Sequence, residues 1–298
     1  MTDTIRIDAP AFLADDPGFY EGRTLVCYHA NCSDGFAAAW VAQLAIPSAV
    51  LLPFFYGQKP PDTAGKIVFV LDFSWDELEP MLEMGWAAAQ MTIIDHHKTA
   101  GPLLRDLILR QVEQAAFFDV SRSGARLALD YFFPGGNPDI EWLIDYVQDR
   151  DLGRRILPGV DAVSCYLDTL EYRPELWSEA ARMGPAAMIQ AGAPIVAYQR
   201  RLVSQLADRA ELVEIGGMTT WAANASVLWS LVASEILARH GGDFALTYRR
   251  RQDGRWEYSL ASAGDFDVSV VAQKYGGGGH HRAAGFEAER LIHRPLRG

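Results

Sequence analysis

Short apolar runs alternate with amphipathic stretches along the first part of the chain. Runs that are rich in β-branched and aromatic residues, and short enough to be buried strands, lie at residues 24–28, 49–55, 66–71 and 91–94. Residues 36–44 and 75–85 instead have the composition and apolar spacing of helices. Strands that alternate with helices favour a parallel sheet with helices on both faces. We therefore expect an α/β fold for this part of the chain.

The pattern changes further along the chain. Amphipathic helices are expected at residues 122–133 and 141–147, and a helix-rich stretch follows at 176–212, broken at Gly184-Pro185 and at residues 192–194. We then expect strands at residues 212–223 and a helix at 226–239. A hairpin of strands 244–250 and 256–261 should follow, and then a short helix at 268–275. The predicted organisation is an α/β domain (residues 1–175), a helical linker (176–212) and a smaller mixed α/β C-terminal domain (213–298).

Composition places the chain among soluble globular proteins. It has 298 residues, of which 49% are hydrophobic and 22% charged. Its three cysteines form no disulfide framework, and residues 1–17 lack an apolar signal-peptide core, so we expect a cytoplasmic protein. Residues 36–57 carry no charge and are long enough to cross a bilayer. Pro53 argues against a membrane span, and we expect a buried helix followed by a strand and no membrane partner.

The net charge of −11 is unevenly distributed. Residues 216–298 contain ten basic and eight acidic side chains, so the acidity lies almost entirely in residues 1–215. Cations that neutralise phosphates dominate the affinity for long nucleic acid, and this chain has few to spare. We expect no long duplex as a partner. A small anionic substrate would have to be held by metal ions and a few local bases.

Metal-competent side chains follow three of the predicted strands. His29 and Asp34 come after residues 24–28, Asp72 follows 66–71, and Asp95-His96-His97 follows 91–94. A single Asp after a strand is more often a helix cap or turn residue. The carboxyl ends of neighbouring parallel strands share one edge, however, and carboxylates with imidazoles suit Mn²⁺, Mg²⁺ or a related ion. A pair of such ions can split phosphate esters.

These motifs resemble those of the DHH phosphoesterase superfamily. The superfamily includes RecJ-like exonucleases, nanoRNases, cyclic-dinucleotide phosphodiesterases and exopolyphosphatases. Its first three motifs match residues 29–35, Leu71-Asp72 and Asp95-His96-His97. The string Gly277-Gly278-Gly279-His280, followed by Ala283-Ala284-Gly285, resembles the signature of the DHH-associated C-terminal domain. The resemblance runs from about residue 24 to residue 286.

The resemblance implies a role for each motif residue. Asp72 would bridge two metal ions, His29 would bind the first, and Asp34, His96 and Asp149 would bind the second. Asp151 is the alternative to Asp149 as the acid of the fourth motif. Asp95 would orient the ligands and His97 would face the substrate phosphate. A water between the metals would be the nucleophile, so no covalent intermediate is expected.

The chain departs from the superfamily pattern in its first motif. The earlier of two expected acids falls on Cys32, or on Asn31, which leaves Asp34 as the acid of this motif. Either the first metal is held more weakly, or Cys32 is a ligand, or one metal suffices, or activity is lost. A thiolate would favour Zn²⁺ or Mn²⁺ over Mg²⁺. Cys32 could also be a small buried filler. We expect one or two Mn²⁺ ions, with Mg²⁺, Zn²⁺ or Co²⁺ as alternatives.

The glycine string is suited to anions, because glycines let backbone N–H groups approach a ligand closely. By resemblance, Gly277, Gly278, Gly279, His280 and Arg282 would hold the phosphate or nucleotide end of the substrate, across a cleft from the metals. The alternative is a flexible loop, although the small residues after it indicate tight packing. Ser123 stands at a helix start, where it would either meet phosphate or cap the helix.

The sequence therefore favours a metal-dependent phosphoesterase that hydrolyses small phosphodiesters, such as short oligonucleotides or linear dinucleotides. One alternative is a phosphoanhydride hydrolase of the exopolyphosphatase type. Another is a degenerate nucleotide-binding sensor whose metal site has decayed at Cys32. A homodimer is compatible with the sequence.

Overall fold

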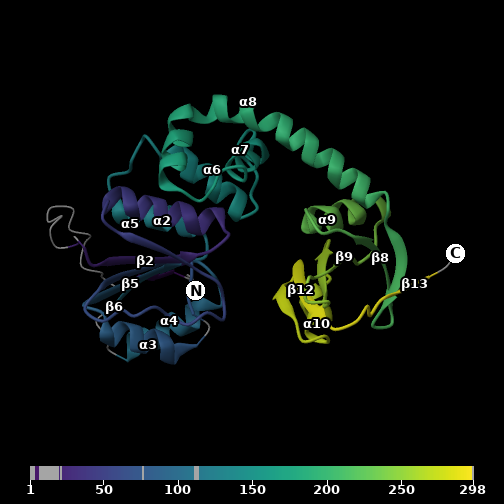
Figure 1. The fold of residues 1–298 in the computed structure, drawn as a ribbon, viewed down its shortest axis with the longest axis horizontal. Coiled ribbons are helices and arrows are strands. Elements are labelled where there is room, and N and C mark those ends of the chain that lie inside the picture. The colour runs from purple at the N-terminus through teal and green to yellow at the C-terminus, as the bar shows by residue number, and fades with distance from the viewer. Residues whose placement is uncertain (1–3, 7–19, 21, 76, 111–113, 297–298) are drawn as a thin grey trace. The chain divides into compact units, whose positions relative to one another are not determined.

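The chain folds into two compact units in the computed structural model, which describes residues 4–6, 20, 22–75, 77–110 and 114–296 (Figure 1). The first unit comprises residues 1–196 and the second residues 197–298. The long helix α8 (Pro174–Ala207) runs across this boundary. We keep residues 176–212 as a proposed linker, because most of them belong to that helix.

The first unit is built on a sheet whose strands occur in the order β1-β6-β5-β4-β2-β3. Their bounds are β1 Thr4–Arg6, β2 Thr24–His29, β3 Val50–Phe54, β4 Ile67–Leu71, β5 Gln90–Asp95 and β6 Gln114–Asp119. Neighbouring strands pair in parallel from β3 to β6, and β1 pairs antiparallel with β6. The predicted parallel sheet is confirmed, and β1 and β6 are strands that the apolar pattern did not predict.

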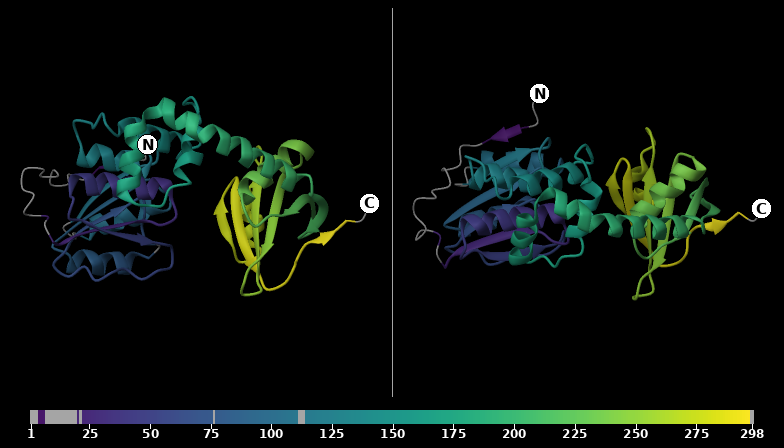
Figure 2. Two further views of the ribbon diagram at one scale, coloured as in Figure 1. Left: turned by 45° about the horizontal axis from the view of Figure 1, so that its top comes forward. Right: turned by 90° about the horizontal axis from the view of Figure 1, so that it is seen from above.

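Helices cover both faces of this sheet (Figure 1; Figure 2, left). The helices are α2 Ser33–Ala45, α3 Leu78–Ala87, α4 Ala100–Leu109 and α5 Gly124–Phe132. Alternate residues of β4 enter opposite cores: Phe69 and Leu71 pack with α2 and α5, and Val68 and Val70 pack with α3 and α4. Each such buried side chain contributes about 1.5–3 kcal/mol. The predicted α/β architecture of this unit is confirmed.

The uncharged stretch at residues 36–57 is divided between α2 and β3, as expected. Trp40 lies in the middle of α2 and is completely buried. No helix in the described part of the chain is both long enough and apolar enough to cross a membrane.

Two further helices, α6 (Glu141–Asp151) and α7 (Val160–Leu167), precede α8. Helix α8 has one non-helical residue, Gly184, so the predicted break at Gly184-Pro185 is confirmed. The second predicted break, at residues 192–194, is wrong, because the helix continues through them. Gly192 is required there by packing: a Cβ would lie 1.9 Å from the carbonyl oxygen of Ala162.

The second unit contains a sheet in the order β11-β12-β10-β9-β8-β7-β13. Its elements are β7 Glu211–Ile215, β8 Met218–Asn224, α9 Trp229–His240, β9 Phe244–Arg250, β10 Trp256–Ser262, α10 Val268–Gln273, β11 Gly278–His280, β12 Ala283–Ala288 and β13 Arg294–Pro295. Strands β8 and β9 are parallel and joined by α9, whereas the other pairs are antiparallel. The predicted mixed α/β character and the β9–β10 hairpin are confirmed.

Candidate metal centre

The predicted ligands gather at the carboxyl edge of the first sheet. The chain leaves β2 for the edge strand β3 and then returns to place β4 on the other side of β2. This reversal creates a crevice between β2 and β4, the position at which open α/β sheets bind ligands. His29 ends β2 and Asp72 directly follows β4, beside the end of β5. The topology therefore explains why separate motifs converge.

Asp72 is at the centre of the cluster. It is 1% exposed and has a φ of 55°, which is unusual for a residue other than glycine. Nε2 of His96 lies 3.1 Å from its Oδ1, Nδ1 of His29 lies 3.8 Å from its Oδ2, and Nδ1 of His97 lies 3.9 Å from Oδ1. Neither carboxylate oxygen has a hydrogen-bond partner among the described residues, and His29 Nδ1 has none either. Buried polar atoms without partners are costly, and a bound cation would satisfy these three.

Asp95 is buried beneath the cluster and is fully hydrogen-bonded. It accepts from the backbone N–H groups of His96 and His97, from Ser74 Oγ at 2.6 Å and from His97 Nδ1 at 2.8 Å. Burial alone would raise the pKa of the Asp95 carboxyl, but the bonds from His97 and Ser74 outweigh it and lower that pKa. An ionised carboxylate only accepts, so His97 Nδ1 carries a proton, and Nε2 is the ring nitrogen that could bind a metal.

Asp34 is fixed by the first turn of α5. Its carboxylate accepts from the backbone N–H of Gly124 at 2.6 Å and of Ala125 at 3.1 Å. The oxygen that accepts from Gly124, Oδ2, also lies 3.7 Å from Nε2 of His96. Ligand atoms of Asp34, His96 and Asp151 lie within 4.8 Å of one another, as do those of Asp72, His96 and His97. Either group could hold a metal ion.

Of the two candidates for the fourth acid, the structure places Asp151 beside the cluster. Asp149 points into the turn after α6, where its carboxylate accepts from the backbone N–H groups of Ile156 and Leu157. Asp151 instead places Oδ2 3.6 Å from His96 Nε2. Residues two apart on a helix point about 200° apart, so only one of the two can face the cluster.

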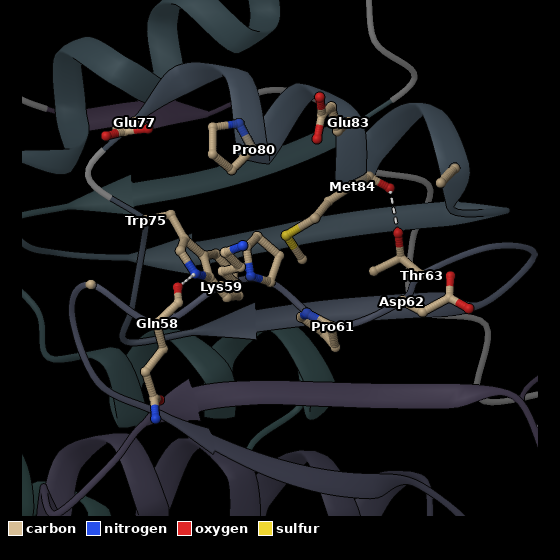
Figure 3. A pocket seen from close by; sticks show the side chains of 13 residues that line it. Gln58, Lys59, Pro61, Asp62, Thr63, Trp75, Glu77, Pro80, Glu83 and Met84 are labelled. Carbon is tan, nitrogen blue, oxygen red and sulfur yellow. Dashed lines mark hydrogen bonds between the residues drawn. The ribbon is translucent and has the colours of Figure 1, made fainter.

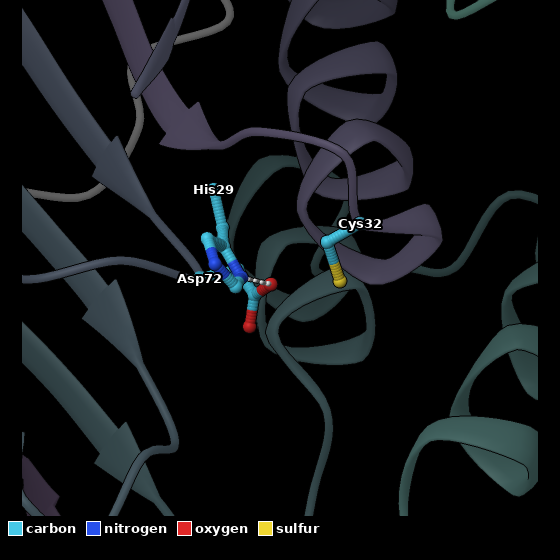
Figure 4. A group of neighbouring side chains, drawn as sticks. All are labelled: His29, Cys32 and Asp72. Atoms are coloured by element: carbon cyan, nitrogen blue, oxygen red, sulfur yellow. Dashed lines mark ion pairs between the residues drawn. The ribbon is translucent and has the colours of Figure 1, made fainter. Parts of the chain in front are cut away.

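Cys32 lies beside Asp72 and His29 (Figure 4), and its sulfur is within 4.8 Å of a ligand atom of each. It is the residue before α2, but its side chain makes no capping hydrogen bond. Burial and the charges of Asp72 and Asp34 raise the pKa of the thiol well above its ordinary value in the metal-free protein. A cation here would reverse that effect, because metals deprotonate coordinating thiols. This position supports the interpretation of Cys32 as a ligand rather than a filler.

The electrostatics of the cluster fit a cation. Burial and the charges of Asp34, Asp95 and Asp151 raise the pKa of Asp72 well above its ordinary value. Burial and Asp34 raise the pKa of Asp151 to about 6. Burial also lowers the pKa of His29, which leaves its imidazole neutral and able to ligate. Crowded carboxylates beside imidazole nitrogens form a donor set that a divalent ion would stabilise.

Ser123 takes one of its two expected positions, that of a helix cap. Its hydroxyl caps α5 by accepting from the backbone N–H of Arg126, and the residue is completely buried. It is therefore a capping residue, inaccessible to substrate.

No pattern in the sequence indicated Ser74, because a lone serine after a strand has no distinguishing feature. Gly124 stood next to Ser123 in the predicted helix start, and its importance follows only from its contact with Asp34.

The glycine string forms a strand rather than a loop. Gly278, Gly279 and His280 make up β11, which pairs with β12 at the edge of the second sheet. A Cβ at Gly277 would lie 2.2 Å from the carbonyl oxygen of Gly285, and one at Gly279 would lie 2.5 Å from the Cα of Ala284. The expectation of tight packing is confirmed. Gly278 faces open space and Arg282 is exposed, so both are accessible to a ligand.

A cavity of about 610 Å³ lies between the loop after β3 and helix α3 (Figure 3). The Trp75 indole donates to the carbonyl of Gln58, and the Thr63 hydroxyl donates to the carbonyl of Met84. None of its lining residues belongs to the groups around Asp72. We do not include this cavity in the metal centre.

Comparisons with known proteins agree with the fold. No protein-family profile matches the sequence. The uncharacterized protein R106 of Acanthamoeba polyphaga mimivirus is 27% identical in an alignment of 289 residues, and the match covers 88% of this chain and 66% of that protein. The chain therefore spans about two thirds of the length of that relative.

Three solved structures are similar at low sequence identity. An exopolyphosphatase-related protein from Bacteroides fragilis has a TM-score of 0.55 and 13% identity, over 90% of this chain and 87% of that one. RecJ from Thermus thermophilus, in complex with Mn²⁺, has a TM-score of 0.53 and 15% identity, and the match covers 96% of this chain and 53% of that one. A pGpG-specific phosphodiesterase from Vibrio cholerae has a TM-score of 0.52 and 11% identity, and the match covers 89% of this chain and 93% of that one. The chain shares the fold of these phosphoesterase-type proteins.

Proposed function

We propose that this chain is a divalent-metal-dependent phosphoesterase of the DHH type that hydrolyses small phosphodiesters. The observation that carries the proposal is the buried Asp72 carboxylate, whose two oxygens lack hydrogen-bond partners among the described residues. Three imidazoles, a thiol and two further carboxylates surround it. The fold shared with RecJ and with the pGpG-specific phosphodiesterase supports the same conclusion.

Two neighbouring ligand groups are used in this proposal, and His96 Nε2 of the second lies 3.1 Å from Asp72 Oδ1 of the first. Asp72, His29 and Cys32 form one, and Asp34, His96 and Asp151 adjoin it. When bound, divalent ions would lower the pKa of water and neutralise charge on phosphoryl oxygens. Mn²⁺ is the proposed ion, because imidazole and thiol ligands suit it better than Mg²⁺.

The other side chains organise the site around these ligands. Asp95 fixes the His97 ring through Nδ1, so that Nε2 remains available to a metal or to the phosphate of a substrate. The N-terminal N–H groups of α5 hold the Asp34 carboxylate in place. His29 contributes a neutral ring because burial lowers its pKa.

Small substrates suit this chain better than long polymers. Residues 1–215 carry the acidic excess of the molecule, which disfavours tracking along a polyanion. Short oligonucleotides and linear dinucleotides carry few phosphates, which metal ions could hold. The exposed Gly278 and Arg282 of the second unit are proposed to bind the phosphate or nucleotide end.

The test is an activity assay on the purified full chain. Samples loaded with Mn²⁺, Mg²⁺, Zn²⁺ or Co²⁺ are offered bis(p-nitrophenyl) phosphate, oligonucleotides of two to five residues and inorganic polyphosphate. We expect mononucleotide release with Mn²⁺, and its loss with EDTA. Phosphate release from polyphosphate alone would favour a phosphoanhydride hydrolase. A folded protein that is silent with every metal, yet binds nucleotide in EDTA, would contradict the proposal and favour a sensor.

A further inference from the structure

A polar cavity of about 340 Å³ adjoins the metal centre within the first unit. One wall is formed by the ligand candidates Cys32, Asp34 and Asp151. Ser164 of α7 and Asp168, the C-cap residue of that helix, also line the cavity. The cavity therefore brings polar side chains that have no part in the metal centre next to its candidate ligands.

The size of the cavity restricts what it can hold. Its volume is near the lower end of the roughly 300–1,000 Å³ that is typical of ligand sites. Val147 and Leu167 are buried apolar residues in its lining, and Ser33, Ser164 and Asn31 supply hydrogen-bonding groups. An apolar surface with several hydroxyl and amide groups suits a sugar ring, which presents both C–H and O–H groups. One nucleoside unit fits this description better than a chain of several.

The charge of the cavity argues against a second phosphate. Apart from the ligand candidates Asp34 and Asp151, its charged lining residues are Arg150 and Asp168, which offset each other. A run of phosphates would need several cations and would be repelled by Asp168. A carboxylate is instead a strong acceptor for a hydroxyl group. Asp168 is exposed in the structure and so is accessible to a ligand in the cavity.

We propose that this cavity is a sugar subsite, in which Asp168 accepts a hydrogen bond from a ribose hydroxyl and Ser164 provides a second polar contact. The inference rests on the proposed function, and it narrows the substrate class to ribonucleotides. A substrate without the 2′-hydroxyl leaves the carboxylate without this partner. A site that hydrogen-bonds a substrate hydroxyl discriminates strongly against the analogue that lacks it.

The experiment compares the diribonucleotide pApA with its 2′-deoxy counterpart on the Mn²⁺-loaded full chain. We expect kcat/KM to be higher for pApA by roughly 10- to 100-fold, the effect of one hydrogen bond to a charged group. Asp168→Ala should reduce this ratio to within about 3-fold, mainly by slowing pApA. Asp168→Asn keeps one acceptor oxygen and should retain part of the preference.

The matched control is Asp161→Asn, also on α7, where Asp161 pairs with Arg155 at 3.2 Å outside the cavity. This variant should keep the wild-type ratio. Equal rates on the two substrates, or a preference unchanged in Asp168→Ala, would overturn the sugar subsite while leaving the phosphoesterase intact.

A binding measurement separates failure of the subsite from failure of the proposed function. AMP and 2′-deoxy-AMP are titrated into the same Mn²⁺-loaded proteins. If nothing is hydrolysed, tighter binding of AMP that is lost in Asp168→Ala still supports the subsite. Equal affinity for the two nucleotides, or binding of neither, would overturn it.

Discussion

The backbone of Gly124 lies directly against the carboxylate of Asp72. A Cβ added at residue 124 would be 2.5 Å from the Asp72 Cβ and 2.7 Å from its Oδ1. The same glycine donates its N–H to Asp34 at 2.6 Å. The start of α5 thus fixes two candidate ligands, and it can approach both only because residue 124 has no side chain.

Gly124→Ala should impair the metal centre without preventing folding. The added methyl must displace Asp72, because backbone and buried carboxylate leave it no space. We expect a loss of stability of about 1–3 kcal/mol from overpacking and at least a tenfold weaker Mn²⁺ affinity, measured by calorimetry. Gly135→Ala is the matched control, since nothing lies within 4 Å of its added Cβ. Equal Mn²⁺ affinities in the two variants would show that the contact has no functional importance.

Asp72→Asn should stabilise the metal-free protein while removing metal binding. The pKa of Asp72 is raised in the folded state. Ionisation of this carboxyl therefore lowers the stability of the metal-free protein at high pH, and the loss of stability becomes smaller as pH falls. The Asn variant should therefore have a higher melting temperature than wild type in EDTA at pH 8, and the advantage should shrink toward pH 5. Thermal unfolding with EDTA or with Mn²⁺ measures both effects.

Asp119→Asn is the opposite control for that experiment. Burial would raise the pKa of Asp119, but hydrogen bonds from Ser121 and Arg122 outweigh it and lower that pKa. The charge of Asp119 therefore adds stability at neutral pH, which is lost as pH falls through its folded-state pKa. Its Asn variant should melt lower than wild type at pH 8. If Asp72→Asn also melts lower in EDTA, the electrostatic account of the cluster is wrong.

Substitution of Asp151 should mainly affect metal binding, whereas substitution of Asp149 should mainly affect stability. Asp151→Asn removes a charge that faces His96, so we expect weaker metal binding and a stability that is unchanged or slightly higher in EDTA. Asp149→Asn disturbs an acceptor of two backbone N–H groups and should cost about 1–3 kcal/mol of stability. Its metal affinity per folded molecule should stay near wild type. Chemical denaturation and metal titration of both variants check this, and the reverse pattern would restore Asp149 as the ligand.

Cys32 should set the metal preference. Replacing the thiol by a carboxylate in Cys32→Asp hardens the donor set, so affinity for Mg²⁺ should rise relative to Zn²⁺. Cys32→Ala should weaken Zn²⁺ binding by about tenfold or more. Cys165→Ala changes a buried cysteine outside the cluster and serves as control. Competition titrations with the two metals give the ratio. A ratio unchanged in Cys32→Asp would mean that the thiol only fills space.

The apolar pattern predicted much of the fold because the core strands of the first unit are buried on both faces. Runs such as Ile67–Leu71 are apolar at every position and end abruptly in polar residues. Strand β6 was missed, since Gln114–Asp119 contains none of the β-branched residues that mark the other parallel strands of this sheet. The break predicted at residues 192–194 was wrong because Gly192 is used for close packing against α7, which no local pattern reveals.

The sequence by itself determined that His29, Asp72 and Asp95-His96-His97 would share one edge, because parallel strands end side by side. Only the tertiary structure decided which groups complete the cluster. Asp149 and Asp151 are the same residue type on the same helix, α6. They differ in the direction of their side chains: Asp149 accepts from the backbone of Leu157, and Asp151 faces His96. The same holds for Ser123, whose hydroxyl caps α5, and for Gly124, whose contact with Asp72 joins residues far apart in the chain. Local pattern specifies which residues end a strand, whereas packing between distant elements specifies where a side chain points.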